Sequence, residues 1–382
     1  MRVAAAFWSV CLLSPVPALA QAVLLVGPTR PFTDIAAAIA AAAPGDRVLV
    51  EAGSYATFTL DKGVAVRAEP PGALVTVSPG AQIYVEVPAG EYATIEGLRL
   101  DSAVTVRRPA AAAVAGQVAL VDVSVSAGIV LDTAELAIWR SQIVGFGRCI
   151  DVFGASALDV SQSTIAGRIG AWIPAIEGIC SAGQARIRVG SSTITGGTAG
   201  FHNVVAASPA VRLASGDRAW FVDCTFAVHQ QPVLATPALI STATAPVVFD
   251  RCTFTDNLGQ PGATVGPVQN GLVLALTSNT PLARGGTFQL DFASRPLLPV
   301  VVHARFGLDA SGFYPFLAGP DFGFVGSSLQ FALRIADAQG HASVPVPIPN
   351  APWVQDLPLW FAGWSELAMP VQMSPAIGGL IR

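Results

Sequence analysis

The sequence predicts an all-β protein that begins with a parallel β-helix and ends with a smaller β-sandwich-like domain. Three observations carry this prediction. A six-residue phrase recurs along the first two thirds of the chain, an Ala-rich segment precedes its copies, and alternating strands with Pro/Gly turns replace it beyond about residue 262. The composition agrees, because 52% hydrophobic and 12% charged residues, with 37 Gly and 29 Pro, suit a turn-rich fold with a large core.

The recurring phrase is apolar at its first and sixth positions, and a further apolar residue stands two positions before each copy. This spacing is the period of a strand, and the copies begin about 26 residues apart on average. Between the first and fourth positions the alternation slips by one residue, as a sharp corner between two strands requires. The seven copies are IEGLRL (95–100), LVDVSV (120–125), IWRSQI (138–143), VSQSTI (160–165), VGSSTI (189–194), FVDCTF (221–226) and FDRCTF (249–254).

Three short strands in each repeat, with like residues stacked on like, describe a parallel β-helix. The alternative fold is a β-sandwich, in which these rows would be aligned only by chance. The fourth position of the phrase forms one inward row, which reads Leu98, Val123, Ser141, Ser163, Ser192, Cys224 and Cys252. Further upstream, a third strand carries an inward row of Val130, Val152 and Leu213, continued less cleanly by Ser181 and Ser241.

The segment 31–55 predicts an amino-terminal cap for the coil stack. Thr33 or Asp34 starts a short Ala-rich helix, and Pro44-Gly45 ends it before Val48 to Val50 enter a strand. An open end of a β-helix has to be covered in this way, because stacking otherwise continues into aggregation.

The segments Pro44-Gly45-Asp46, Val48-Leu49-Val50 and Glu51-Ala52-Gly53-Ser54-Tyr55 resemble the start of proteins in the pectate-lyase-like superfamily. The resemblance covers roughly residues 27–260 and implies a right-handed parallel β-helix. Toward the carboxy end, Ile348-Pro349-Asn350 and Leu359-Trp360-Phe361 resemble a β-sandwich-like module of exported bacterial proteins. Such a module either attaches or sorts the protein, or closes the other end of the helix.

The domain boundaries and the location follow from the ends of these patterns. Residues 1–20 read as a cleaved secretory signal, residues 21–262 as the β-helix domain, and residues 268–382 as the carboxy-terminal domain. We therefore expect a secreted, periplasmic or cell-surface protein without a membrane span. The formal net charge of −4 argues against a nucleic-acid partner.

Four cysteines remain after the signal. Cys224 and Cys252 stack in the inward row on adjacent coils, either as a disulfide or as two core thiols. Cys149 and Cys180 are predicted on the outer face of neighbouring coils, two positions out of step, so a bridge between them would need a register shift.

The resemblance implies that catalytic groups lie on the outward face of the strand before the first corner and on the long loops that enter it. The outward positions expected there are Ala127 and Ile129, Cys149 and Asp151, Gly178 and Cys180, Ala210 and Arg212, and Ala238 and Ile240. This face offers one carboxylate, whereas a calcium-dependent lyase needs several and a glycoside hydrolase needs a pair. The catalytic candidates of a noncanonical site are Asp151, Glu177, His202 and Arg212.

The loops that enter this strand carry polar and aromatic groups that can bind a sugar. Trp172 would stack on the apolar face of the sugar, and Arg148, Asn203 and His229 would hydrogen-bond its hydroxyls. The alternative is that these residues only solvate a surface. No metal site is expected, because His202 and His229 lack further ligands at suitable spacing, and no cofactor is expected.

A last row stacks outward on consecutive coils and reads Thr164, Thr193, Thr225 and Thr253. A flat threonine row can match a regular lattice such as ice or crystalline polysaccharide, but the sequence favours the simpler reading, since Thr is a good exposed strand former. We expect a non-catalytic protein that binds carbohydrate or another envelope component. The alternatives are a polysaccharide lyase or glycoside hydrolase with a noncanonical site, and a purely structural or adhesion protein.

Overall fold

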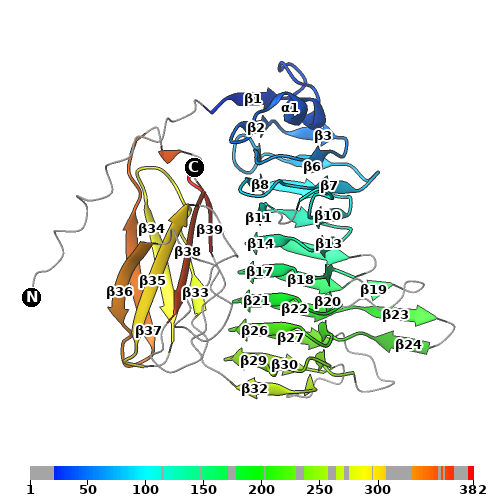
Figure 1. Ribbon diagram of the computed structural model, residues 1–382, viewed down its shortest axis with the longest axis vertical. Coiled ribbons are helices and arrows are strands. Elements are labelled where there is room, and N and C mark those ends of the chain that lie inside the picture. Colours follow the sequence, from blue (N-terminus) through cyan, green and yellow to red (C-terminus); the bar gives the residue numbers. More distant parts are fainter. Residues whose placement is uncertain are drawn as a thin grey trace, which may run out of the picture.

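The structure is a computed structural model, and it confirms the predicted fold class. A parallel β-solenoid of about eight turns forms the larger part, and a smaller antiparallel β-domain lies alongside it (Figure 1). The described residues are 21–112, 116–145, 148–167, 169–170, 178–201, 204–228, 236–256, 264–270, 275–294, 296–306, 329–351, 354–355, 358–364 and 377–382. The predicted signal, residues 1–20, lies outside them.

Each turn of the solenoid adds one strand to each of three parallel sheets, which we call sheets A, B and C in the order in which the chain visits them. Sheet A holds β1 (Val23–Val26), β2 (Arg47–Val50), β5 (Ala65–Ala68), β8 (Tyr92–Glu96), β11 (Gln117–Val121), β14 (Glu135–Trp139), β17 (Ala157–Ser161), β21 (Arg186–Gly190), β26 (Arg218–Val222), β29 (Val247–Asp250) and β32 (Val268–Asn270). Sheet B holds β3 (Gly53–Tyr55), β6 (Val75–Val77), β9 (Leu98–Leu100), β12 (Ser124–Val125), β15 (Gln142–Gly145), β18 (Thr164–Gly167), β22 (Thr193–Gly196), β27 (Thr225–Val228) and β30 (Thr253–Thr255). Sheet C holds β4 (Thr59–Leu60), β7 (Ile83–Val85), β10 (Val104–Arg107), β13 (Ile129–Asp132), β16 (Ile150–Phe153), β20 (Ile179–Ser181), β25 (Val211–Leu213), β28 (Leu239–Ser241) and β31 (Thr264–Val265).

The inward rows predicted from the recurring phrase are confirmed on sheets A and B. Strand pairing places Leu120 beside Ile138 and Ile165 beside Ile194, and the remaining copies follow the same register. These side chains fill one continuous core inside the coil, because each turn buries its apolar face against the turns above and below.

In the seven turns that carry the phrase, the corner between sheets A and B is built by one residue in the left-handed backbone region. The third position of every phrase has a positive φ, from 47° at Ser191 to 72° at Gly97. A residue in this region turns the chain sharply, which explains the slip in the alternation.

Buried serines tie neighbouring corners together. The hydroxyl of Ser141 donates to the carbonyl of Trp139 at 2.8 Å and accepts from the amide of Val123 on the preceding turn at 3.2 Å. Ser163 accepts in the same way from the Ser141 amide at 3.1 Å. The inward row therefore tolerates serine, because each hydroxyl satisfies backbone groups that the corner leaves without strand partners.

The predicted cap is confirmed as α1 (Ile35–Ala41). The side chain of Asp34 accepts a hydrogen bond from the Ala36 amide at 2.6 Å, which makes Asp34 the N-cap. Asp46 fixes the turn after the helix, since its carboxylate accepts hydrogen bonds from the amides of Ala22 and Ala43. Ile35 and Ile39 lie on the buried side of this helix, at the end of the coil stack.

The inward row on sheet C is confirmed except at one turn. Val152, Ser181, Leu213 and Ser241 are buried as predicted, but on β13 the inward residue is Leu131, which pairs with Val152. The prediction that Val130 faces inward was wrong by one residue, because the sequence there offers an unbroken apolar run, Ile129-Val130-Leu131, with no polar residue to mark the face.

A short additional sheet extends from the side of the solenoid between sheets B and C. It consists of β19 (Ile169–Gly170), β23 (Thr198–Phe201) and β24 (Val204–Ala207), the last two pairing as an antiparallel hairpin.

In its described residues the carboxy-terminal domain contains two antiparallel sheets, and it packs against the outer face of sheet A instead of closing the end of the solenoid (Figure 1). Trp139 of β14 and Phe288 share one apolar cluster, with ring centroids 6.1 Å apart. At the far end, β31 and β32 add to sheets C and A beyond residue 262, where the phrase stops. The domain's strands are β33 (Ala275–Thr277), β34 (Thr287–Ala293), β35 (Pro299–Phe306), β36 (Leu329–Ile335), β37 (His341–Pro347), β38 (Pro358–Trp364) and β39 (Ile377–Leu380).

Candidate binding groove

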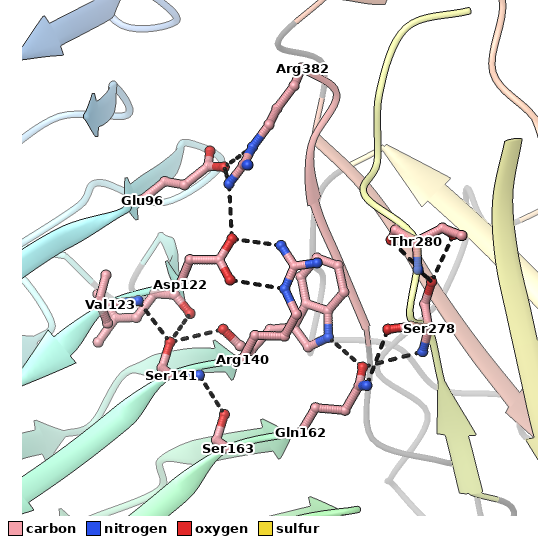
Figure 2. A network of polar contacts seen from close by, with 12 residues as sticks. Glu96, Asp122, Val123, Arg140, Ser141, Gln162, Ser163, Ser278, Thr280 and Arg382 are labelled. Carbon is pink, nitrogen blue, oxygen red and sulfur yellow. Dashed lines mark hydrogen bonds and ion pairs between the residues drawn. The ribbon is translucent and has the colours of Figure 1, made fainter. Parts of the chain in front are cut away.

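A network of charged side chains joins the corners of the solenoid to the carboxy-terminal domain (Figure 2). Arg382 donates to Glu96 at 2.6 Å and to Asp122 at 2.8 Å. Asp122 also accepts two hydrogen bonds from Arg140, at 2.9 and 2.6 Å, in a bidentate pair. The corner residues Asp122 and Arg140 thus hold each other on adjacent turns and hold Arg382 beside them.

Gln162 provides a second connection between the two domains. Its side-chain oxygen accepts from the Trp139 indole at 2.9 Å and from the Ser278 amide at 3.2 Å, and its side-chain nitrogen donates to the Ser278 carbonyl at 3.1 Å (Figure 2). The Arg140 guanidinium lies over the Trp139 ring, 3.9 Å from its centroid. Gln162, Trp139 and Arg140 are therefore each held by at least two contacts.

The region where these side chains connect the two domains is called the joint below. Burial has the largest effect on the pKa values of its ionisable groups. Glu96 is only 2% exposed, and its burial raises the pKa of its carboxyl above the usual range, although Arg382 acts in the opposite direction. Burial lowers the pKa of Arg382, but the carboxylates of Glu96 and Asp122 outweigh burial and raise it on balance. Burial likewise raises the pKa of Tyr92, whose hydroxyl accepts a hydrogen bond from the Trp360 indole at 3.0 Å.

A groove of about 750 Å³ runs along the corner between the joint and the outer face of sheet B. It crosses five successive strands of that sheet, from β6 to β18, which corresponds to a length of about 19 Å at the usual strand spacing. Its lining mixes guanidinium, amide, hydroxyl and a few apolar groups, and its polar members are Arg99, Asp122, Ser124, Arg140, Ser141, Gln142, Gln162, Thr164 and Arg382.

Successive turns present side chains to this groove in strict register. Arg99 pairs with Ser124, Ser124 with Gln142, and Gln142 with Thr164. The side chains of Arg99, Gln142 and Thr164 are exposed. An elongated groove with hydrogen-bonding groups repeated at one-strand intervals is suited to a long polyhydroxylated ligand.

A smaller groove of about 450 Å³ lies between α1 and sheet C. Ala36, Ile39 and Phe58 contribute to its wall, with Asp61 and Tyr84 at its polar side. This groove is formed partly by α1, the helix that covers the end of the core.

Some of the sequence candidates gather on the outer face of sheet C. Arg148 donates to Asp151 at 3.0 Å, and strand pairing places Asp151, Cys180 and Arg212 on three consecutive turns. Asp151 and Arg212 are therefore two strands apart, roughly 10 Å at the usual spacing. The other candidates lie outside the described residues: Trp172, Glu177, His202, Asn203 and His229.

Sequence reasoning missed a second carboxylate on this face. Because β13 is shifted by one residue from the predicted register, its outward residues are Val130 and Asp132 instead of Ala127 and Ile129. Asp132 is exposed and accepts a hydrogen bond from Thr133 at 2.9 Å. It lies one turn from Asp151 and two residues along the strand, which is a diagonal separation of about 7–8 Å between neighbouring strands.

The cysteines differ in part from their predicted surroundings. Cys149 was predicted on the outer face, but it is fully buried at the entry to β16, and its burial raises the pKa of its thiol to about 12. Gly178, Ala210 and Ala238, expected outward at the matching position, are buried as well, since the chain turns into the core before each strand of sheet C. Cys180 is also buried.

Cys224 and Cys252 stack one turn apart at the inward position and are free thiols that hydrogen-bond to each other. Burial first, and then the neighbouring thiol, raises the pKa of Cys224, whereas the hydrogen bond from Cys224 lowers that of Cys252. The sequence leaves a disulfide and a pair of core thiols as alternatives, and the structure has the two thiols.

Metal sites and membrane-spanning helices can be judged for the part of the chain that the structure describes. No group of three or more His, Cys, Asp and Glu side chains there could hold a metal ion. None of its helices is long and apolar enough to cross a bilayer.

No protein-family model and no curated protein sequence matches this chain. The parallel solenoid is therefore assigned from its own strand pairing, and the family resemblances of its two parts remain hypotheses.

Proposed function

We propose that this chain is an exported, non-catalytic binding protein that holds carbohydrate in the groove beside sheet B. The observation that carries the proposal is the register of Arg99, Ser124, Gln142 and Thr164, which offers one hydrogen-bonding side chain per turn along an open channel. Sugar hydroxyls both donate and accept, so amide and hydroxyl side chains are matched partners for them.

We further propose that the chain belongs to the pectate-lyase-like class of right-handed β-helices and carries the carboxy-terminal module of exported bacterial proteins. We also propose that residues 1–20 are removed on export. Amino-terminal sequencing of the exported protein tests the last point, and a start near Gln21 is expected.

Retention on immobilised polysaccharides tests the binding function. We expect the chain to be retained by at least one carbohydrate matrix, and Gln142→Ala to weaken the retention roughly five- to tenfold, the cost of about one lost hydrogen bond. Gln339→Ala is the matched control, because Gln339 is an exposed amide in a turn of the carboxy-terminal domain. Equal retention of wild type and Gln142→Ala on every matrix would show that the groove is not the binding site.

A second function, glycoside hydrolysis, is favoured by Asp132 and Asp151. They offer two carboxylates on adjacent strands of one face, at a diagonal backbone separation of about 7–8 Å, and a glycoside hydrolase needs such a pair beside the scissile bond. Measured release of reducing sugars from a polysaccharide panel, lost in Asp151→Asn, would establish this function in place of the first. The sugar platform expected at Trp172 stays a prediction, and unchanged retention of Trp172→Ala on every polysaccharide would end it.

A further inference from the structure

The outward row that lines the groove continues beyond it to β30, the last described strand of sheet B. Strand pairing connects Thr164 to Thr193, Thr193 to Thr225, and Thr225 to Thr253, and all four side chains are exposed. From Arg99 to Thr253 the row spans seven consecutive strands, about 29 Å at the usual spacing.

The parallel row two residues further along each strand leaves this surface flat. It consists of small or β-branched side chains that are only half exposed: Val144, Ala166, Thr195, Ala227 and Thr255. A chain lying on the threonine row can therefore approach the strands without meeting a bulky side chain.

Charge along this surface is absent or already compensated. Between β15 and β30 the two outward rows contain no charged residue. Within the groove, Arg99 is paired with Asp101 at 3.0 Å, and Arg140 and Arg382 are paired with Asp122. An acidic polymer would have to compete with these carboxylates, whereas an uncharged one would not.

We propose that the groove and the threonine row form one track for a single chain of an uncharged linear polysaccharide, which lies parallel to the solenoid axis. The inference rests on the proposed carbohydrate-binding function and names its ligand class and direction. The two outward rows from β15 to β30 contain no aromatic side chain, so each turn contributes only hydrogen bonds, and affinity has to accumulate over many turns.

The length of the bound chain is the first readout. Titration calorimetry with cello-, manno- and xylo-oligosaccharides of increasing length should show affinity rising with length for at least one series. Oligogalacturonides, which are acidic, should bind more weakly than the neutral series of the same length. Tighter binding of the acidic series would overturn the assignment of an uncharged ligand.

The second readout is the double variant Thr193→Val and Thr225→Val, which removes two hydroxyls while keeping the shape and strand preference of both side chains. It should weaken the longest oligosaccharides at least about fivefold and leave the shortest unchanged, because short chains occupy only the groove. Thr287→Val, at an exposed strand position on β34, is the control that should change neither.

The outcomes separate the two proposals. If Gln142→Ala weakens binding of every length but the double variant weakens none, the groove binds carbohydrate and the longer track is wrong. If no oligosaccharide binds and Gln142→Ala changes no retention, the proposed function fails as well. Binding to ice or to crystalline polysaccharide, without binding of any soluble oligosaccharide, would show that the threonine row recognises a lattice and would overturn the single-chain track.

Discussion

Phe226 lies directly against Phe254 on the next turn, with ring centroids 4.6 Å apart and ring planes at 7°. Both are the sixth residue of the repeated phrase, and Phe226 is fully buried. This pair illustrates the packing of the whole solenoid. The position of a residue within the repeat determines which row it joins, and the number of its repeat determines where it lies along the solenoid axis.

This stack makes Phe226 a sensitive position for stability. Phe226→Ala should lower the free energy of unfolding by about 3–5 kcal/mol, because the neighbouring turns can close the resulting cavity only in part. Phe226→Leu should cost clearly less, since most of the volume is kept. Urea unfolding followed by circular dichroism measures both, and an equal cost for the two variants would contradict a tightly stacked row.

The left-handed corner residues give a second prediction. Ser191 has a φ of 47°, so Ser191→Val should destabilise the protein by about 1–2 kcal/mol, because a β-branched residue is strongly disfavoured there. Ser191→Gly should be neutral or stabilising. Thr195→Val on the exposed face of sheet B is the control, and a Ser191→Val variant as stable as this control would argue against the corner geometry.

The buried joint predicts a pH-dependent stability. Because the pKa of Glu96 is raised by folding, its contribution is most favourable when the carboxyl is protonated and is lost as the pH rises through the raised pKa. Glu96→Gln should therefore gain stability relative to wild type as the pH increases above the ordinary glutamate range. Unfolding free energies measured over a pH series check this, and a difference that stays constant or falls with pH would contradict it.

The two stacked thiols should react unequally. Cys252 is half-buried with a lowered pKa, so iodoacetamide should modify it first and at lower pH than an ordinary thiol, while Cys224 stays protonated and protected. Peptide mass mapping of the folded protein identifies the labelled residue. Equal labelling of both cysteines, or a mass two hydrogens lower that reveals a disulfide, would contradict the prediction.

Most of the fold could be predicted because each turn of a solenoid repeats the same pattern of inward and outward residues along the sequence. The rows through Ile95, Ser141 and Phe226 were recognisable from residue type alone, and so was a helix start at Thr33 or Asp34, of which the structure has Asp34 as the N-cap. The recurring phrase could not show where the carboxy-terminal domain lies. The domain covers the outer face of sheet A, and nothing in the phrase marks the outward positions there, such as Trp139, as contacts.

Less of the site could be predicted, for two physical reasons. A run of three apolar residues at Ile129 hid the register of β13, and with it the outward position of Asp132. The groove depends on Arg382 meeting Asp122 and on Gln162 meeting Ser278, each across more than a hundred residues of sequence, and the recurring phrase does not indicate either partner.

The most direct test of the account is a crystal structure of the full chain soaked with a neutral linear oligosaccharide that the protein binds. We expect the sugar rings to lie along sheet B, parallel to the solenoid axis, with hydrogen bonds to Gln142 and Thr164. An oligosaccharide bound instead on sheet C, across Asp132 and Asp151, would contradict the groove and favour the hydrolase.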